Sequence, residues 1–302
     1  MKKFLLLILN VSIVVLLFGQ GIVKEKQVIA SKILNRDVHY SIYLPSDYNS
    51  SERSYPVTYL LHGHGDADDG WIQFGEINRL ADKAIADGTI PPMIIVTPDG
   101  FKSYYINAAD GSLPYEDFFI KELIPHIEKT YKVKAERKYR GIAGLSMGGG
   151  TALNVVQSNN ERIAGLILVN PMIHVAFLPH QVAYLISHFQ KLRSSVGNDI
   201  KRPGITEHGY DALPTRGIAE LLKMLKITRK NLSQITVPVQ LFHSVEDHTL
   251  PVSNTEIVMA GLGSVNKSRI ELVNSYHVAT LDYDQELIFQ NSLTFIQGLT
   301  RP

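Results

Sequence analysis

Residues 141–150 read Gly-Ile-Ala-Gly-Leu-Ser-Met-Gly-Gly-Gly, and this stretch decides the fold. An apolar run leads into a Gly-x-Ser-x-Gly turn centred on Ser146, and a helix-forming segment, residues 151–157, follows the turn. A strand, a sharp turn and a helix in this order hold a serine in a strained conformation above a sheet. Gly144 and Gly148 fit this turn because a side chain at either position would collide across it. The pattern predicts Ser146 as a nucleophile; the alternative is a glycine-rich turn with an incidental serine.

Composition limits the classes of protein that need to be considered. The chain has 302 residues, 45% of them apolar, which is enough for one large core or two modest ones. Its 30 basic and 29 acidic residues leave a net charge of +1, so charge favours neither nucleic acid nor an acidic membrane surface as a partner. The absence of cysteine excludes disulfides, thiol catalysis and thiolate metal sites.

The first 21 residues have the pattern of a secretory signal peptide. Lys2 and Lys3 precede an apolar segment, residues 4–18, and Gly19 and Gly21 supply small residues for cleavage after Gly21. The apolar segment is shorter than the roughly 20 residues that a membrane-spanning helix needs. We therefore expect a secreted or periplasmic protein with no stable membrane association after cleavage. The alternative is an uncleaved membrane tether.

From residue 28 onward, strand-like and helix-like segments alternate. Two strand-like runs, residues 28–34 and 38–44, flank a polar turn and predict a hairpin. Further strands are predicted at 55–61, 93–97, 139–143, 163–169, 237–242 and 269–273, and helices at 77–85, 118–131, 257–262 and 286–296. This alternation predicts an α/β fold, with a doubly wound, mostly parallel sheet across residues 22–302.

The long interval between strands 163–169 and 237–242 does not fit a simple crossover. Two amphipathic segments, residues 182–189 and 218–225, lie within it and are joined by a polar segment rich in Gly and Pro. This pattern predicts a small helical cap, residues 172–233, inserted over the carboxyl edge of the sheet. The alternative is two ordinary packing helices and a disordered linker.

A serine nucleophile needs a base, and the base needs an acid that fixes its tautomer. On this kind of sheet the partners follow in the chain order Ser, Asp or Glu, His, each on a loop after a later strand. Glu246 and Asp247 follow strand 237–242, and His277 follows strand 269–273. The sequence therefore predicts Asp247 as the acid, with Glu246 as the alternative, and His277 as the base.

Two backbone N–H groups are expected to form an oxyanion hole. One belongs to Met147, directly after the serine, and the other to His64, in the loop after the early buried strand. An alternative exists for this loop, because His62, His64 and Asp66 match part of a zinc-binding pattern in metallo-hydrolases. Ala67 stands where that pattern carries another histidine.

The motifs resemble two branches of the α/β-hydrolases. Residues 28–155 resemble the secreted esterase D family, which includes feruloyl and acetylxylan esterases, whereas residues 163–300 are similar to bacterial carboxylesterases of the monoacylglycerol lipase type. The motifs of the first part are Tyr55-Pro56-Val57, Leu61-His62-Gly63, Thr97-Pro98-Asp99-Gly100, Tyr115-Glu116-Asp117 and Gly144-Leu145-Ser146-Met147-Gly148-Gly149. Those of the second part are residues 210–215 (YDALPT), Glu246-Asp247-His248 and residues 275–282 (SYHVATLD).

The resemblance implies an α/β-hydrolase fold with Ser146, Asp247 and His277 as nucleophile, acid and base, and with no metal or organic cofactor. It also supports a cap between about 172 and 233. Because the two parts resemble different branches, we hypothesise a recombined or engineered chimera with its seam just after the nucleophile helix.

The expected activity is hydrolysis of short- to medium-chain acyl esters, small molecules that the apolar cap helices favour. The loop with Tyr104 and Tyr105 is an alternative acceptor for an aromatic or sugar-linked ester. Three other functions use the same scaffold: an acyltransferase, a serine peptidase, and a binding protein without catalysis. The sequence leaves the oligomeric state open.

Overall fold

The computed structural model describes residues 19–63, 65–101, 105, 107, 113–175, 180–190, 192–194, 198–206 and 212–300. The predicted signal peptide, residues 1–21, therefore lies outside the described residues except for its last three. Within the described ranges no helix combines the length and the apolar character needed to cross a membrane. Gly21 is tied to the folded chain, because its N–H donates to the carboxylate of Asp82 at 2.8 Å.

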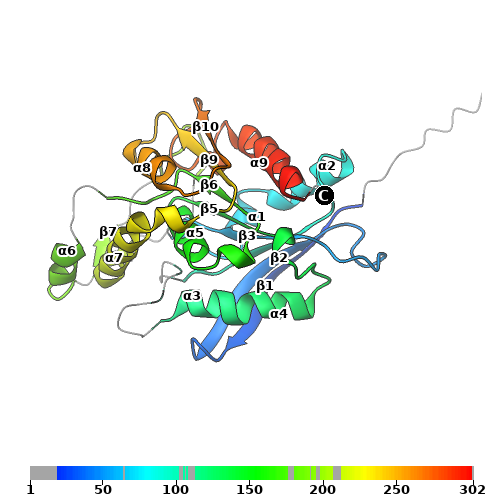
Figure 1. Cartoon of the computed structure of the whole chain (residues 1–302), viewed down its shortest axis with the longest axis horizontal. Helices are drawn as coiled ribbons and strands as arrows, with labels where there is room; N and C mark the ends of the chain where they lie inside the picture. The colour runs from blue at the N-terminus through cyan, green and yellow to red at the C-terminus, as the bar shows by residue number, and fades with distance from the viewer. Residues whose placement is uncertain are drawn as a thin grey trace, which may run out of the picture.

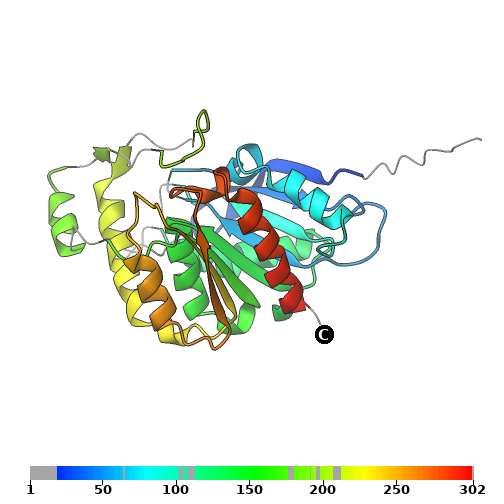
Figure 2. The ribbon, with the colours of Figure 1, turned by 90° about the horizontal axis from the view of Figure 1, so that it is seen from above.

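A central sheet carries helices on both faces (Figures 1 and 2). Its strands are β1 (Ile22–Ser31), β2 (Arg36–Leu44), β3 (Val57–Leu61), β4 (Ile94–Pro98), β5 (Arg140–Leu145), β6 (Gly165–Val169), β9 (Val239–Ser244) and β10 (Lys267–Leu272). Their order in the sheet is β1-β2-β4-β3-β5-β6-β9-β10. The pairs β1–β2 and β2–β4 are antiparallel and the other pairs are parallel, so the predicted hairpin and the predicted mostly parallel sheet are confirmed.

The helices cover the sheet in two layers. They are α1 (Gly70–Gln73), α2 (Ile77–Ala86), α3 (Tyr115–Phe118), α4 (Ile124–Thr130), α5 (Met147–Gln157), α6 (His180–Ile186), α7 (Thr215–Lys230), α8 (Ser253–Gly261) and α9 (Gln285–Thr300). Short 3-10 turns occur at Arg137–Tyr139, Asn160–Arg162, Leu232–Gln234 and Ala279–Leu281. Side chains of α4, α5 and α7 share one buried cluster with the sheet, and those of α2 and α9 share a second cluster. In Figure 1, α2 and α9 lie above the sheet and α4 lies below it.

The helix predicted at residues 118–131 is interrupted. A π-helical turn, Phe119–Leu123, separates α3 from α4. Pro125 lies in the first turn of α4, and its ring nitrogen has no hydrogen to donate to the preceding turn. The wider π-helical turn before Pro125 lets the chain continue as a helix although one regular backbone hydrogen bond is missing.

The segment predicted as a cap, residues 172–233, contains α6, α7 and a short antiparallel pair, β7 (Leu192–Ser194) and β8 (Ala212–Pro214). Leu221 and Leu225 of α7 belong to the main core, whereas Leu222 packs with Ala183 of α6. Thus α7 serves as the crossover helix between β6 and β9 and also supports α6, which lies beyond it from the sheet in Figure 2. The division into a catalytic domain, residues 22–302, and an inserted cap stays a prediction.

The proposed seam lies inside one continuous core. Val156 before it and Ile163 after it are fully buried, in the same cluster as Val57 and Val239 from the two parts of the chain. The chimera concerns the origin of the sequence, and it stays a hypothesis.

Candidate active site

The turn around Ser146 has the predicted strained geometry. Ser146 follows β5 directly, with a φ of 55° and a ψ of −117°, and Met147 begins α5. A Cβ atom at Gly144 would lie 2.3 Å from the carbonyl oxygen of Gly148, so only glycine fits there. The predicted requirement for glycine at position 144 is therefore confirmed. The strained turn holds the hydroxyl of Ser146 at the carboxyl edge of the sheet.

His277 reaches Ser146 from the loop between β10 and the turn Ala279–Leu281. Its Nε2 atom lies 2.8 Å from the Oγ atom of Ser146, and the histidine is 5% exposed. Asn170 holds this loop in place, because its side-chain amide donates to the carbonyl oxygen of His277 at 2.7 Å. Asn170 is fixed in turn by Ser244, whose N–H donates to its amide oxygen at 2.7 Å.

Asp247 completes the line of hydrogen bonds. Its Oδ2 atom lies 2.8 Å from Nδ1 of His277, and its Oδ1 atom accepts the N–H groups of Thr249 and Leu250 at 2.8 and 2.7 Å. These bonds hold the carboxylate so that Nδ1 carries the proton and Nε2 faces the serine. The alternative acid, Glu246, does not reach the site, because its carboxylate pairs with Lys201 at 3.1 Å.

Of the two residues predicted to form the oxyanion hole, Met147 lies within the described part of the chain. Met147 is the first residue of α5, so its N–H has no acceptor within the helix. Gly148 lies against the backbone after β3, since a Cβ atom there would be 2.4 Å from the carbonyl oxygen of Leu61. This contact brings the loop after β3 beside the serine turn. His64, the predicted second donor, lies outside the described residues.

The zinc alternative depended on His62, and His62 is engaged with the backbone. Its Nδ1 atom lies 2.8 Å from the carbonyl oxygen of Gly63, and its Nε2 atom accepts the N–H of Gly100 at 3.1 Å. Among the residues described, no group of three His, Asp or Glu side chains is placed to hold a metal ion. The contacts of His62 therefore assign it to fixing the loop.

The predicted tyrosine loop is only partly described. Tyr105 is 2% exposed, donates its hydroxyl to the carbonyl oxygen of Pro98 and accepts the N–H of His62. Burial raises the pKa of the Tyr105 hydroxyl well above its usual value, as expected of a core residue. Tyr105 thus supports the loop after β3, and its hydroxyl is engaged with the backbone. Tyr104 lies outside the described residues.

Asp199, for which the sequence offers no signal, binds both the loop that carries Asp247 and the loop that carries His277. Its carboxylate accepts the N–H of His277 at 3.2 Å, the N–H of His248 at 3.0 Å and Nδ1 of His248 at 2.9 Å. Burial alone would raise the pKa of Asp199, but the hydrogen bonds from His248 and His277 outweigh it and hold the pKa below the usual value. Asp199 therefore stays ionised and links the predicted cap segment to the acid loop and the base loop.

A second carboxylate reinforces this link. Asp282 accepts the N–H groups of Lys201, Arg202 and Tyr276 at 2.7, 3.0 and 3.0 Å. Residues 198–202 are thereby fixed against the histidine loop. The motif of residues 275–282 included Asp282, but no spacing rule connects it to a segment about eighty residues earlier.

Known proteins that resemble this chain are named as esterases and lipases. Residues 31–174 match the family model described as putative esterase. The chain is 35% identical over 156 residues to a thermostable monoacylglycerol lipase of Bacillus sp. (strain H-257), a match that covers 51% of this chain and 61% of the lipase. It is 38% identical over 116 residues to an endo-1,4-beta-xylanase/feruloyl esterase of Xylanibacter ruminicola, covering 36% of this chain and 16% of that protein. The chain thus spans less than two thirds of either relative.

A solved ferulic acid esterase superposes with a TM-score of 0.68 at 22% identity, covering 93% of this chain and 99% of that one. The fold is therefore that of the α/β-hydrolases. The similar proteins are named as esterases and as a lipase, which agrees with the class of protein that the motifs resemble.

Proposed function

We propose that this chain hydrolyses carboxylic esters through an acyl-enzyme intermediate on Ser146. One observation carries the proposal: two consecutive contacts of 2.8 Å join Ser146 Oγ to His277 Nε2 and His277 Nδ1 to Asp247 Oδ2. A hydroxyl in this position can lose its proton to the ring at the moment of attack.

The steps follow from the contacts. Ser146 Oγ attacks the ester carbonyl carbon while His277 Nε2 takes its proton, and the Asp247 carboxylate stabilises the imidazolium that forms. The predicted donors to the oxyanion are the N–H groups of Met147 and His64, and each such donor contributes about 3 kcal/mol to lowering the barrier. His277 then gives the proton to the departing alcohol. A water molecule then attacks the acyl-enzyme carbonyl while His277 takes its proton. His277 returns the proton to Ser146 Oγ, and the carboxylic acid is released.

The substrates we propose are small short- to medium-chain acyl esters, and the near-neutral charge gives no reason to expect nucleic acid as a partner. The names of the similar proteins, a monoacylglycerol lipase and a feruloyl esterase, favour ester substrates but differ in the acid released. We also propose a secreted or periplasmic location, supported by residues 1–21. Fractionation of the producing cells followed by N-terminal sequencing tests this, and protein that stays in the cytoplasm with residue 1 at its start would contradict it.

The decisive assay is hydrolysis of p-nitrophenyl butyrate by the chain from Ile22 onward, beside Ser146→Ala, with and without EDTA. We expect activity that is unchanged by EDTA and lost in the variant. Activity that EDTA abolishes would revive a metal mechanism at His62 and His64. A folded, inactive wild type would favour a binding protein on this scaffold.

A further inference from the structure

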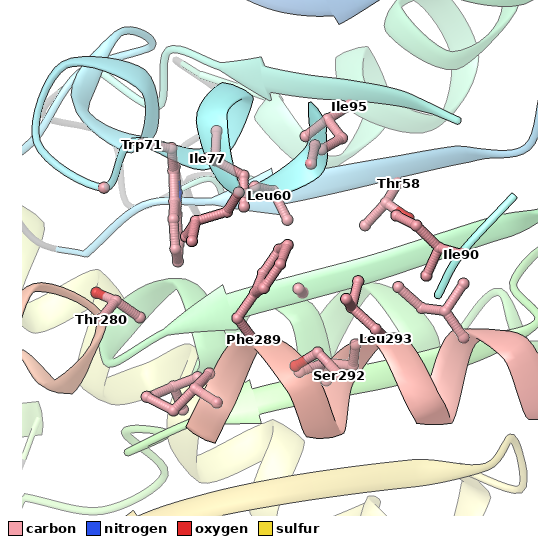
Figure 3. A pocket seen from close by; sticks show the side chains of 18 of the residues that line it. Thr58, Leu60, Trp71, Ile77, Ile90, Ile95, Thr280, Phe289, Ser292 and Leu293 are labelled. Carbon is pink, nitrogen blue, oxygen red and sulfur yellow. The ribbon is translucent and has the colours of Figure 1, made fainter. Parts of the chain in front are cut away.

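An apolar pocket lies between α2, α9 and the sheet, on the face opposite α5 (Figure 3). Its volume is about 100 Å³. Aliphatic and aromatic side chains of the sheet and of the helices on this face line it, among them Leu60 on β3, Ile77 at the start of α2, and Phe289 and Leu293 on α9. Figure 3 shows Phe289 and Leu293 pointing from α9 toward the sheet, and Trp71 standing at one end.

The pocket has room for an apolar ligand. An engineered apolar cavity of roughly 150 Å³ stays dry and binds benzene. A pocket of comparable scale with an almost wholly hydrocarbon lining fits several methylene groups and rejects charged groups.

A second, smaller pocket, called the passage below, adjoins this space on the side of the catalytic edge. Trp71, Gly75 and Thr280 line both pockets. The smaller one continues to Leu145 and Val278, which are the chain neighbours of Ser146 and His277. Its volume is about 20 Å³, so the passage is narrow.

The passage also holds a polar atom without a partner. The indole N–H of Trp71 is buried and has no hydrogen-bond partner. A buried donor of this kind costs free energy unless a ligand or water oxygen meets it. Trp71 lies where the two pockets meet, so an ester oxygen or a bridging water entering from the catalytic edge would satisfy it.

We propose that the passage and the pocket between α2 and α9 bind the acyl chain of the substrate, and that this chain is unbranched and of medium length. The narrow passage past Trp71 selects a straight alkyl chain over a bulky aromatic acid. The inference rests on the proposed function, because the chain must start at a carbonyl carbon attacked by Ser146. It places the acyl group on the α2 and α9 side of the sheet, away from the predicted cap.

Kinetics with a series of p-nitrophenyl esters, acetate to decanoate, tests the assignment. In the wild type, each methylene that enters the pocket should raise kcat/KM about fourfold until the space is filled. Ser292→Leu, which fills the pocket from α9, should leave acetate hydrolysis within about twofold and remove the rise for longer chains. Thr294→Leu is the matched control, because Thr294 is exposed on the same helix and outside the pocket lining.

Fluorescence gives a test that does not depend on turnover. Trp71 is the one tryptophan of the sequence, so its emission reports on the passage directly. Alkyl fluorophosphonates react with an activated serine, and those that end in bromine quench an indole only on contact. We expect an eight-carbon bromoalkyl adduct of Ser146 to quench Trp71, while the two-carbon adduct and the unbrominated eight-carbon adduct leave its emission unchanged.

The outcomes separate the two proposals. Complete labelling of Ser146 without quenching at any chain length would overturn the acyl pocket and leave the esterase proposal standing. An equal loss across all esters in Ser292→Leu would also overturn the pocket assignment. A folded chain whose Ser146 does not label would overturn the proposed function, and the acyl pocket with it.

Discussion

The carboxylate of Asp199 accepts the backbone N–H of His277 at 3.2 Å, although 78 positions separate the two residues in the chain. The main-chain carbonyl of Asp199 also accepts the N–H of Val278 at 3.0 Å. The segment before α7 therefore holds the histidine loop at two points. Since the same carboxylate accepts the N–H of His248, Asp199 also fixes the loop that carries Asp247. The geometry of the triad thus depends on a residue from outside both loops.

Replacing Asp199 by Asn should lower kcat with little change in KM. The amide keeps the size of the side chain but lacks the negative charge that accepts the N–H groups of His248 and His277. The loops that carry Asp247 and His277 are then held less firmly, and the His277 ring shifts relative to Ser146. A misplacement of about 1 Å can cost about 100-fold in rate. Burst titration with p-nitrophenyl acetate counts the active sites, so that slower catalysis is distinguished from loss of folded protein. Asp87→Asn, at an exposed carboxylate, is the control and should behave as wild type.

Ser146→Ala and His277→Ala should each reduce kcat by about 10⁴- to 10⁶-fold, and the double variant should be no worse than the poorer single variant. The residues of a triad act as one unit, so their effects do not add. Steady-state kinetics with p-nitrophenyl butyrate measures all three. Ser158→Ala, at the other end of α5, is the matched control. Additive losses would show that Ser146 and His277 act separately.

Two Gly→Ala substitutions should have opposite effects on stability. Gly144→Ala places a Cβ atom 2.3 Å from the Gly148 carbonyl oxygen, so it should lower the melting temperature and abolish activity. Gly298→Ala places one in open space within α9, where alanine stabilises a helix by about 1 kcal/mol relative to glycine. Thermal unfolding followed by circular dichroism measures both. A stable, active Gly144→Ala variant would contradict the strained turn.

The protein should lose stability as the pH falls from 7 to 5. Burial lowers the pKa of His243, and the positive charge of Arg269 adds to this shift, so the folded protein favours the neutral ring. The unfolded chain binds the proton at higher pH than the folded protein does, and stability therefore falls below the usual histidine value of about 6.5. Burial also lowers the pKa values of His126 and His174.

His243→Gln should flatten this pH dependence. The amide cannot be protonated in this range and can keep a hydrogen bond to Thr255, which lies 3.1 Å from the His243 ring nitrogen. Melting temperatures measured at half-unit pH steps give the slope. His188→Gln, at an exposed histidine, is the control. An unchanged slope in His243→Gln would contradict the assignment.

Local pattern was sufficient to predict the sheet and the serine turn. Strand β6 is a continuous apolar run because both faces of a parallel strand are covered, and such a run is visible in the sequence. Gly144 and Gly148 were recognisable because the turn admits no side chain. The partners of Ser146 were predictable from chain order alone, since each follows a strand at the same edge of the sheet.

The tertiary structure decided the features that depend on residues far apart in the chain. The sequence predicted Asp247 with Glu246 as the alternative, and only the tertiary structure showed that Asp247 contacts His277 while Glu246 pairs with Lys201. Asp199 and the pocket beside Trp71 gave no sequence signal, because each arises where segments from different parts of the chain pack together. The sequence by itself determined the α/β fold and predicted the serine turn and the histidine that contacts it, since local sterics and strand order carry that information. Packing alone decided how the loops of Asp247 and His277 are held and where the apolar pocket lies.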